Sequence, residues 1–411
     1  MTTKSEFTHA AMVPLIGGEA LGSEAAFGRR PEYIMSFKPF AKHDAHLLNW
    51  YENEVPYHVL DDGAKHGGQV DVVSSVCPCA GLSSLSTKYS SDNETNEWMI
   101  TCAEYVLGEV KPKVYWGENS PNLAGNVGAK FRARLFQVGR QHGYSMSLYR
   151  TKSLLHGMSQ VRERAFYFFW EGDKIPLLEY YSRPYERIEN TILNARGNSL
   201  QEPINSRRPT ENPYYRYVLE VVAGGKTHRD FCSTIETRVK DILTYIEEAG
   251  HDWGDVATWM DAHGYENRAN HCRYFKEKVD NGMGFMKREN IIPRDHIGAF
   301  VGHYPLMLMH PIEDRYITYR EAMTIMGMPQ SFELLDPKKN YNHICQNVPV
   351  PTATDIATEV RAALEGRRSF IDSVYALQFN HDQSYRVNDP CLTQIATEAA
   401  QPEHSLVNFI Q

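Results

Sequence analysis

The sequence has no long hydrophobic run, few cysteines and no excess of positive charge. Hydrophobic residues make up 42% of the 411 residues and charged residues 23%, which is ordinary for a globular protein. No stretch of about 18 apolar residues is present, so we expect no membrane-spanning helix. The stretch MTTKSEFTHAAMVPLIGG lacks the apolar centre of a secretory signal. The seven irregularly spaced cysteines do not suggest a disulfide framework, so we expect a reducing, cytoplasmic setting. A net charge of −8 does not point to nucleic-acid binding, although a local basic face would suffice for it.

Short apolar runs alternate with helical patterns over residues 1–175. We predict strands at 12–15, 33–37, 70–76, 114–116 and 165–170, and helices at 19–27, 40–51, 97–110 and 130–142. This alternation predicts an α/β fold with a mostly parallel sheet and crossover helices. The stretch IGGEALG after the first strand fits the first crossover of a doubly wound fold, where a helix N-terminus faces a ligand.

The pattern changes after residue 170, where Tyr, Arg, Asn and His become frequent and only one clear amphipathic helix, near 235–249, is visible. Further on, TYREAMTI begins a helix with Thr318 as its cap and Glu321 three residues later. Arg320 and Glu321 are expected to contribute an internal ion pair, and another helix is predicted at 352–364. The predicted organisation is a catalytic domain at 1–175 completed by 330–365, a smaller second domain at 176–305, a connecting helix region at 306–329 and a C-terminal extension at 366–411.

The stretch SVCPCAGLS ends an apolar run with a cysteine between a proline and a turn of small residues. A buried strand that delivers a thiol to a loop is one way to present a nucleophile. The same pattern also ends ordinary strands, so Cys79 could equally be a structural thiol or, with Cys77, half of a metal site. No Cys or His pair lies at a convincing spacing to complete such a site, and we predict no metal.

Five motifs follow one another in a definite order: PCAGLS, GENSPNL, HGMSQVRERAF, RYITYREAMTIMGMP and NVPVPTATDIATEV. This succession resembles the DNA (cytosine-5) methyltransferases over roughly residues 11–175 and 305–365. Each motif alone is weak, whereas all five in order around a long variable segment are specific. The resemblance implies a Rossmann-like class I methyltransferase domain with a second, smaller target-recognition domain.

The chemistry that the resemblance implies needs a thiolate, an acid and a guanidinium. C5 of cytosine is a poor nucleophile, so the ring is activated by addition at C6, for which Cys79 is the thiol. Glu118 would protonate or hydrogen-bond N3. Arg162 and Arg164 are two apart on a predicted strand and so face the same side, and the resemblance assigns Arg164 to hold the base and the glutamate. Taken singly, Glu118 could be a surface acid and the arginines part of an ion-pair ladder. The target base must be flipped out of the duplex.

The resemblance implies S-adenosylmethionine as methyl donor, but the segments expected around it have changed. The family opens with an acid and Phe-x-Gly-x-Gly-Gly, whereas this chain reads AMVPLIGG, in which Leu15 replaces the first glycine and Pro14 removes an N–H group. Ser36 stands where a ribose-binding glutamate is usual, and Asp61 or Asp62 would contact the adenine. The residues assigned to the donor are Ile16, Gly17, Gly18, Ser36, Asp61, Asp62, Pro78, Asn347 and Val348.

Three functional interpretations stay open at this point. The chain binds S-adenosylmethionine through other contacts, or it uses another one-carbon donor, or it is a catalytically silent DNA-binding protein that works with a partner. A metabolic enzyme of Rossmann type is disfavoured by the long insertion before RYITYREA.

Double-stranded DNA is the expected partner, in the cytoplasm of a bacterial or phage-infected cell. We expect the second domain to hold the duplex, mainly through contacts of Arg and Lys with phosphates. Most tyrosines of this segment are expected to be domain core. The residues assigned to DNA are Ser83, Ser84, Arg183, Arg187, Arg207, Arg208 and Arg216.

Overall fold

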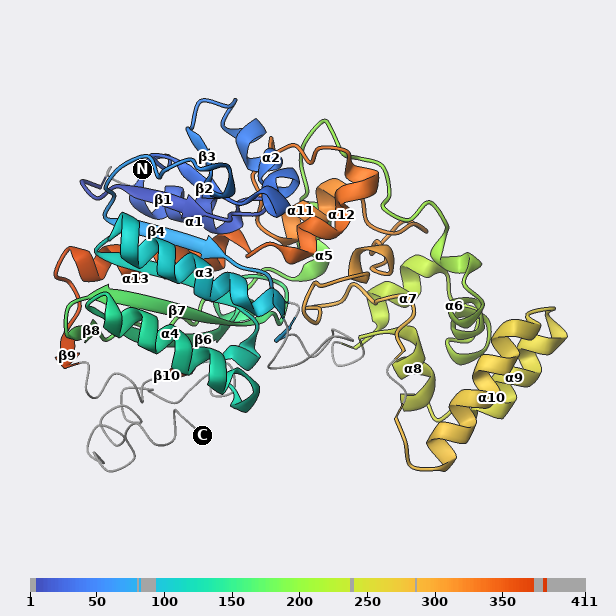
Figure 1. Cartoon of the computed structure of the whole chain (residues 1–411). Helices are drawn as coiled ribbons and strands as arrows, with labels where there is room; N and C mark the ends of the chain where they lie inside the picture. Colours follow the sequence, from blue (N-terminus) through green and yellow to red (C-terminus); the bar gives the residue numbers. More distant parts are fainter. Residues whose placement is uncertain are drawn as a thin grey trace.

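A mixed sheet forms the centre of the protein. The computed structural model describes residues 5–79, 81–82, 94–236, 240–284, 287–372 and the backbone of 380–382. Within these residues the main sheet has eight strands in the order β10-β6-β7-β5-β4-β1-β2-β3 (Figure 1). The strands are β1 (His9–Met12), β2 (Ile34–Ser36), β3 (Tyr57–Val59), β4 (Val72–Val76), β5 (Val114–Asn119), β6 (Tyr144–Lys152), β7 (Glu163–Glu171) and β10 (Asn380–Asp382). Strands β1 to β5 are parallel, and β7 runs antiparallel between β5 and β6.

Helices cover both faces of this sheet, which confirms the predicted α/β class. Helices α3 and α4 lie in front of the sheet, and α1 and α13 pack against each other behind it (Figure 1). The helices of this part are α1 (Gly18–Phe27), α2 (Ala41–Trp50), α3 (Glu97–Tyr105), α4 (Ala129–Gln141), α11 (Tyr319–Ile325), α12 (Pro337–Gln346) and α13 (Val350–Leu364). Because β1 to β5 are parallel, the loops that follow them meet at one edge of the sheet.

Several short helices beyond β7 form a lobe beside the sheet (Figure 1). They are α6 (Pro213–Tyr217), α7 (His228–Thr234), α8 (Ile242–Glu248), α9 (Trp253–Ala262) and α10 (Glu266–Asp280). Helix α5 (Ile188–Leu193) precedes them in the chain and packs against α11. From α6 onwards they enclose an apolar core that includes the fully buried Tyr214 and Tyr215. The helix predicted near 235–249 is found in part, as α8, which begins after its cap Asp241 and is shorter than expected. The other helices of this segment were not predicted, because most of them are too short to show a helical period.

Other differences from the predicted elements have local causes. The first strand ends at Met12, since Val13 and Leu15 have positive φ angles of 51° and 55°; the strand predicted at 12–15 is therefore wrong. Strand β6, the antiparallel partner of β7, was not predicted. Residues 366–372 contribute a further strand, β9 (Phe370–Asp372), which pairs with β8 (Lys174–Pro176).

The capping box at Thr318 and Glu321 is confirmed. The internal ion pair expected here does not join Arg320 to Glu321. Instead, the Arg315 guanidinium lies 2.8 Å from the Glu321 carboxylate, while Arg320 donates to the Phe332 carbonyl at 2.9 Å.

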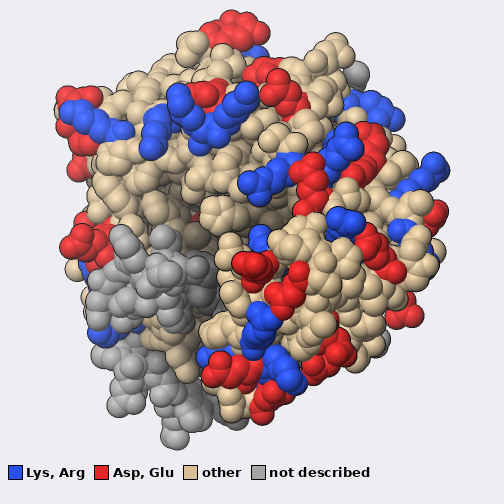
Figure 2. Space-filling model, turned by 90° about the vertical axis from the view of Figure 1, so that its right-hand side faces the viewer, with Lys and Arg blue, Asp and Glu red and all other residues tan. Residues whose placement is uncertain are grey.

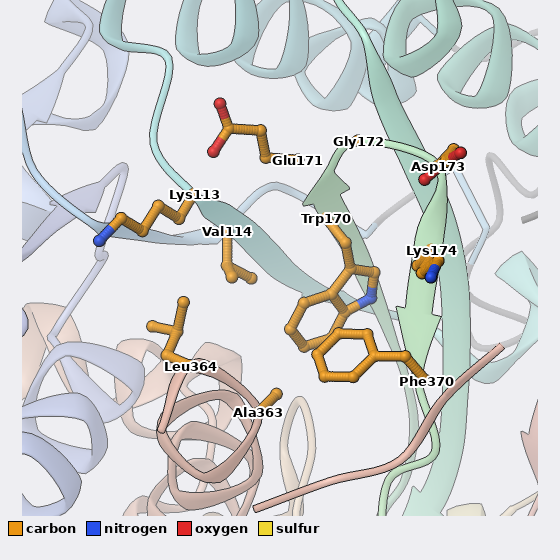
Figure 3. A pocket seen from close by; sticks show the side chains of 10 residues that line it. All are labelled: Lys113, Val114, Trp170, Glu171, Gly172, Asp173, Lys174, Ala363, Leu364 and Phe370. Carbon is orange, nitrogen blue, oxygen red and sulfur yellow. The ribbon is translucent and has the colours of Figure 1, made fainter. Parts of the chain in front are cut away.

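A cavity of about 420 Å³ opens at the other end of the sheet, beside the start of β5. The side chains of Lys113, Trp170, Leu364 and Phe370 line it (Figure 3). Strand β5 begins at Val114, beside this cavity. The loops that follow the parallel strands lie at the opposite end of the sheet. The cavity is therefore separate from the site described next.

Candidate functional site

Cys79 lies in the loop after β4 and is half-buried. Its carbonyl accepts from Leu82 N at 3.0 Å, which closes a tight turn. The Leu82 carbonyl in turn accepts from Ser120 Oγ at 2.9 Å and Asn122 Nδ2 at 2.8 Å. The loop after β5 thus holds the loop that carries the thiol. Neither Ser120 nor Asn122 was singled out in the sequence, because this contact depends on the pairing of β4 with β5.

Glu118 and Arg164 meet because of the register of three strands. In β5, Glu118 lies opposite Val76 of β4 on one side and Phe166 of β7 on the other. Arg164, two residues before Phe166, places its Nε 2.6 Å from Glu118 Oε1. Glu118 is buried, so removing one member of this pair would leave an uncompensated charge.

Arg162 is buried, and its guanidinium donates hydrogen bonds to main-chain carbonyls. Its Nη1 donates to Phe300 O at 3.0 Å and to Cys345 O at 2.9 Å. Burial, with a contribution from the neighbouring Arg164, lowers the pKa of Arg162 to about 9. These contacts favour a positioning role, in which Arg162 joins the start of β7 to the segment after the lobe and to the end of α12.

Gln160 completes this connection and was not among the predicted site residues. Its Nε2 donates to Ile325 O at 3.1 Å, and its Oε1 accepts from Phe300 N at 3.2 Å. The signal for it was in the sequence, in the Gln of SQVRERAF, two residues before Arg162.

Burial raises the pKa of the Cys79 thiol above its usual value. Arg164 acts against this effect and Glu118 reinforces it, because a cation stabilises a thiolate and an anion opposes it. The thiolate is therefore disfavoured in the free protein, and a substrate that changes these surroundings favours its formation.

Replacing Glu118 with glutamine should make Cys79 more reactive toward a simple electrophile. The substitution removes a negative charge that raises the thiol pKa, so a larger thiolate fraction is present at a given pH. We expect the rate of alkylation by iodoacetamide to rise severalfold at pH 8 and its pH profile to shift toward lower pH. Mass spectrometry of the modified peptide measures this rate at Cys79.

The matched control is Glu97→Gln, since Glu97 is an exposed acid of α3 that pairs with Arg134. Its alkylation profile should equal that of the unmodified protein. A slower or unchanged alkylation of Glu118→Gln would show that Glu118 does not act on the thiol.

The loop between β1 and α1 adjoins the turn at Asn347 and Val348. Gly18 N donates to Asn347 Oδ1 at 2.7 Å, inside the protein. A Cβ on Gly18 would lie 1.9 Å from the Val348 carbonyl oxygen. The small size of Gly18 is therefore needed to pack the start of α1 against the 347–348 turn. Two segments assigned to the donor by resemblance are brought together here, from opposite ends of the chain.

The remaining residues assigned to the donor lie at the ends of β2, β3 and β4. Ser36 is fully buried at the end of β2, and Pro78 precedes Cys79. Asp61 and Asp62 are exposed and both engage Lys38, since Asp61 Oδ1 accepts from the Lys38 N–H at 3.0 Å and Asp62 pairs with its ammonium.

Two buried carboxyl groups at this edge were missed by the sequence analysis. Glu19 lies in the first turn of α1 and Asp44 in the first turn of α2, and both are fully buried. Within the described residues, both Glu19 oxygens and Asp44 Oδ1 have no hydrogen-bond partner. Buried carboxyl oxygens of this kind fit a ligand that carries hydroxyl or amino groups. The sequence signal was an acid directly after GG, but an exposed helix acid looks the same in a sequence.

The arginines assigned to DNA differ in their surroundings. Three are paired within the chain: Arg183 with Asp355, Arg187 with Glu189 and Arg216 with Glu220. Arg207 and Arg208 are exposed, and no ion pair joins either of them to another described residue. Figure 2 shows Lys and Arg interspersed with Asp and Glu on the face at the right of Figure 1. Ser83 and Ser84 lie outside the described residues.

In the part of the chain that the structure describes, no group of three His, Cys, Asp or Glu side chains is arranged to hold a metal ion. None of its helices combines the length and the apolar character needed to cross a bilayer.

Comparison with known proteins points to one family. The profile of the C-5 cytosine-specific DNA methylases matches residues 16–362. The chain is 23% identical over 355 residues to DNA (cytosine-5)-methyltransferase 3 of Arabidopsis thaliana, covering 73% of this chain and 23% of the relative. It is 22% identical over 386 residues to DNA (cytosine-5)-methyltransferase 2 of Zea mays, covering 75% of this chain and 41% of the relative. It thus spans less than half the length of these relatives.

Among solved structures, the methyltransferase EhMeth of Entamoeba histolytica has a similar fold. The TM-score is 0.53 at 11% identity, and the match covers 88% of this chain and 99% of the other. At this identity the likeness concerns the fold alone. It supports the Rossmann-like methyltransferase architecture predicted for the sheet and its helices.

Proposed function

The chain belongs to the C-5 cytosine-specific DNA methylase family, and we propose that it transfers a methyl group from S-adenosylmethionine to C5 of cytosine in double-stranded DNA. The observation that carries the proposal is the convergence of the Cys79 loop with the Glu118–Arg164 ion pair at the ends of β4 and β5. A nucleophile, an acid and a cation at one end of a parallel sheet are what addition to a cytosine ring requires.

The proposed reaction starts with a flipped-out cytosine, because C5 and C6 are inaccessible inside a duplex. Cys79 loses its proton, its Sγ forms a bond to C6, and the electron pair of the C5–C6 double bond is shared between C5 and N3. Glu118 stabilises N3 by a proton or a hydrogen bond. Arg164 holds the Glu118 carboxylate in place and is available to the base. After C5 has gained its substituent, the C5 proton leaves as H⁺ and its electron pair forms the C5–C6 double bond again. The S–C6 bond breaks with its electron pair on sulfur, so the Cys79 thiolate is released and regains a proton, and a proton held at N3 returns to Glu118.

S-adenosylmethionine, when bound, supplies the electrophilic methyl group. The residues proposed to hold it lie around Gly18, Asn347 and the end of β2. Its ribose hydroxyls and amino group match the buried carboxyl oxygens of Glu19 and Asp44 in chemistry. The residues present therefore fit this donor, although Leu15 and Ser36 depart from the usual pattern.

Arg207 and Arg208 are proposed to contact DNA phosphates. Their exposure and the absence of a described ion-pair partner leave their charge available, in contrast to Arg216, which pairs with Glu220. We expect Arg207→Gln/Arg208→Gln to weaken DNA binding about tenfold at 0.1 M salt and to reduce the dependence of log Kd on log[salt] by up to about 2. Fluorescence anisotropy over a salt series measures both quantities.

The matched control for this DNA measurement is Arg216→Gln, which removes an arginine that is already paired. It should leave the salt dependence nearly unchanged. Equal effects of both substitutions would place the duplex elsewhere on the protein.

Nucleoside mass spectrometry of DNA from cells that express the chain tests the proposed function. 5-Methylcytosine that appears only on expression supports it. Detection of a cytosine derivative of another mass would indicate another one-carbon donor in place of S-adenosylmethionine. The changed β1–α1 loop and Ser36 favour this candidate. Unmodified cytosine, together with retained DNA binding, would support a catalytically silent DNA-binding protein that acts with a partner.

A further inference from the structure

We propose that the carboxyl groups of Glu19 and Asp44 form a paired acceptor site that binds the hydroxyl and amino groups of a nucleoside-type donor. The nearby end of β2 carries only Ser36. The carboxyl groups of this site therefore come from the helices α1 and α2. The inference rests on the proposed function for the identity of the donor, but the site itself is defined by this chain's own residues.

Asp44 lies where four segments meet. Its Oδ2 accepts from the Tyr57 hydroxyl of β3 at 2.9 Å. The Ser36 hydroxyl and the Leu15 N–H are close enough to lower its pKa, although burial dominates and raises it to about 7. Asp44 thus lies beside the end of β2, the start of β3 and the β1–α1 loop. The end of β2 belongs to the edge where doubly wound sheets bind nucleosides.

One carboxyl oxygen of Asp44 is available to accept a hydrogen bond from a ligand. Oδ1 is buried and has no partner among the described residues. An acid at this edge of the sheet is suited to accept from ribose hydroxyls. The Ser36 side chain, with a single short hydroxyl, cannot accept two such bonds in parallel.

Glu19 is the second acceptor, and it differs from Asp44 in that both of its carboxyl oxygens lack a described partner. It directly follows Gly18 and is fully buried. Burial raises its pKa well above the ordinary value, the N–H groups of Ala20 and Glu19 itself lower it in part, and the nearby carboxylates of Asp44 and Glu118 raise it further. Glu19 therefore lies within electrostatic reach of both Asp44 and the catalytic Glu118.

A buried carboxyl oxygen without a hydrogen-bond partner is costly in the free protein. A bound ligand that donates hydrogen bonds, or that carries positive charge, removes this cost. Glu19 and Asp44 thus lower the stability of the empty protein and raise its affinity for the donor, which distinguishes them from acids that merely hold the fold together.

Calorimetric titration with S-adenosylhomocysteine tests the site without any turnover. We expect Glu19→Gln and Asp44→Asn each to weaken binding about tenfold or more. The melting temperature of the ligand-free variants should be equal to or above that of the unmodified protein, since each substitution removes a buried acid. The matched control is again Glu97→Gln, which should change neither quantity.

Each outcome decides the proposal. Unchanged affinity in both variants overturns it, and so does an absence of binding by the unmodified protein. A lower melting temperature in both variants would assign them a structural role; Glu19→Asp, which keeps the carboxyl group, should then restore stability without restoring affinity. Methylated DNA together with unchanged affinity would refute only this inference, whereas lost affinity together with unmethylated DNA would refute only the methyl transfer.

Discussion

Replacing Cys79 with alanine is expected to abolish product formation while leaving the fold and most of the DNA affinity intact. Among the described residues no other thiol is placed to attack C6, because the other cysteines there, including Cys77 and Cys102, are buried. Loss of a catalytic nucleophile costs on the order of 10⁶-fold in rate. No side-chain hydrogen bond joins Cys79 to another residue that the structure describes, so its loss should not disturb β4 or β5. Transfer of labelled methyl groups to a cytosine-containing duplex, followed by anisotropy with the same duplex, measures both properties.

Cys272→Ala is the matched control for this substitution. Cys272 is a buried cysteine of α10, in the lobe, and its replacement should leave methyl transfer within about twofold because the cost is a small loss of stability. If Cys79→Ala loses DNA binding together with activity, the thiol has a structural role and the addition mechanism is wrong for this chain.

Replacing Gly18 with alanine is expected to lower the free energy of unfolding by about 3 kcal/mol, through overpacking and loss of a buried hydrogen bond. The added Cβ would lie 1.9 Å from the Val348 carbonyl oxygen and 2.5 Å from Asn347 Oδ1. Backbone cannot move aside as an exposed side chain can, so α1 has to shift away from the 347–348 turn. Urea denaturation followed by circular dichroism measures the change.

Gly284 offers the corresponding control for the alanine substitution at Gly18. A Cβ at this position meets no atom of another described residue within 4 Å, so Gly284→Ala should change the free energy of unfolding by less than about 0.5 kcal/mol. If Gly18→Ala is as stable as Gly284→Ala, the start of α1 is free to move, and the contact between the loop and the 347–348 turn is not what holds these segments together.

Part of the site was predictable because it rests on local chemistry. Alternating apolar runs predicted the α/β fold, and an ordered set of motifs pointed to Cys79, Glu118 and Arg164 as the residues to examine. Two arginines at a spacing of two were expected on one face of a strand. The structure separates their surroundings, since Arg164 contacts Glu118 whereas Arg162 is turned to the carbonyls of Phe300 and Cys345.

Other features depend on which elements pack together. The end of β1 was misplaced because Val13 and Leu15 adopt positive φ angles that their residue types disfavour. The lobe was under-predicted because short capped helices have little periodicity. Glu19 and Asp44 look like ordinary helix acids in the sequence, since burial is a property of neighbours that are distant along the chain.

The sequence by itself determined the class of fold, the family and the order in which its reactive residues appear, because apolar periodicity and short motifs are local properties of the chain. Only the tertiary structure decided which charges meet. The antiparallel register of β7 on β5 brings Arg164 to Glu118, and the packing of α1 and α2 over the ends of the strands buries two carboxyl groups. Registers and packing are set by contacts between residues far apart in the chain, which no local pattern records.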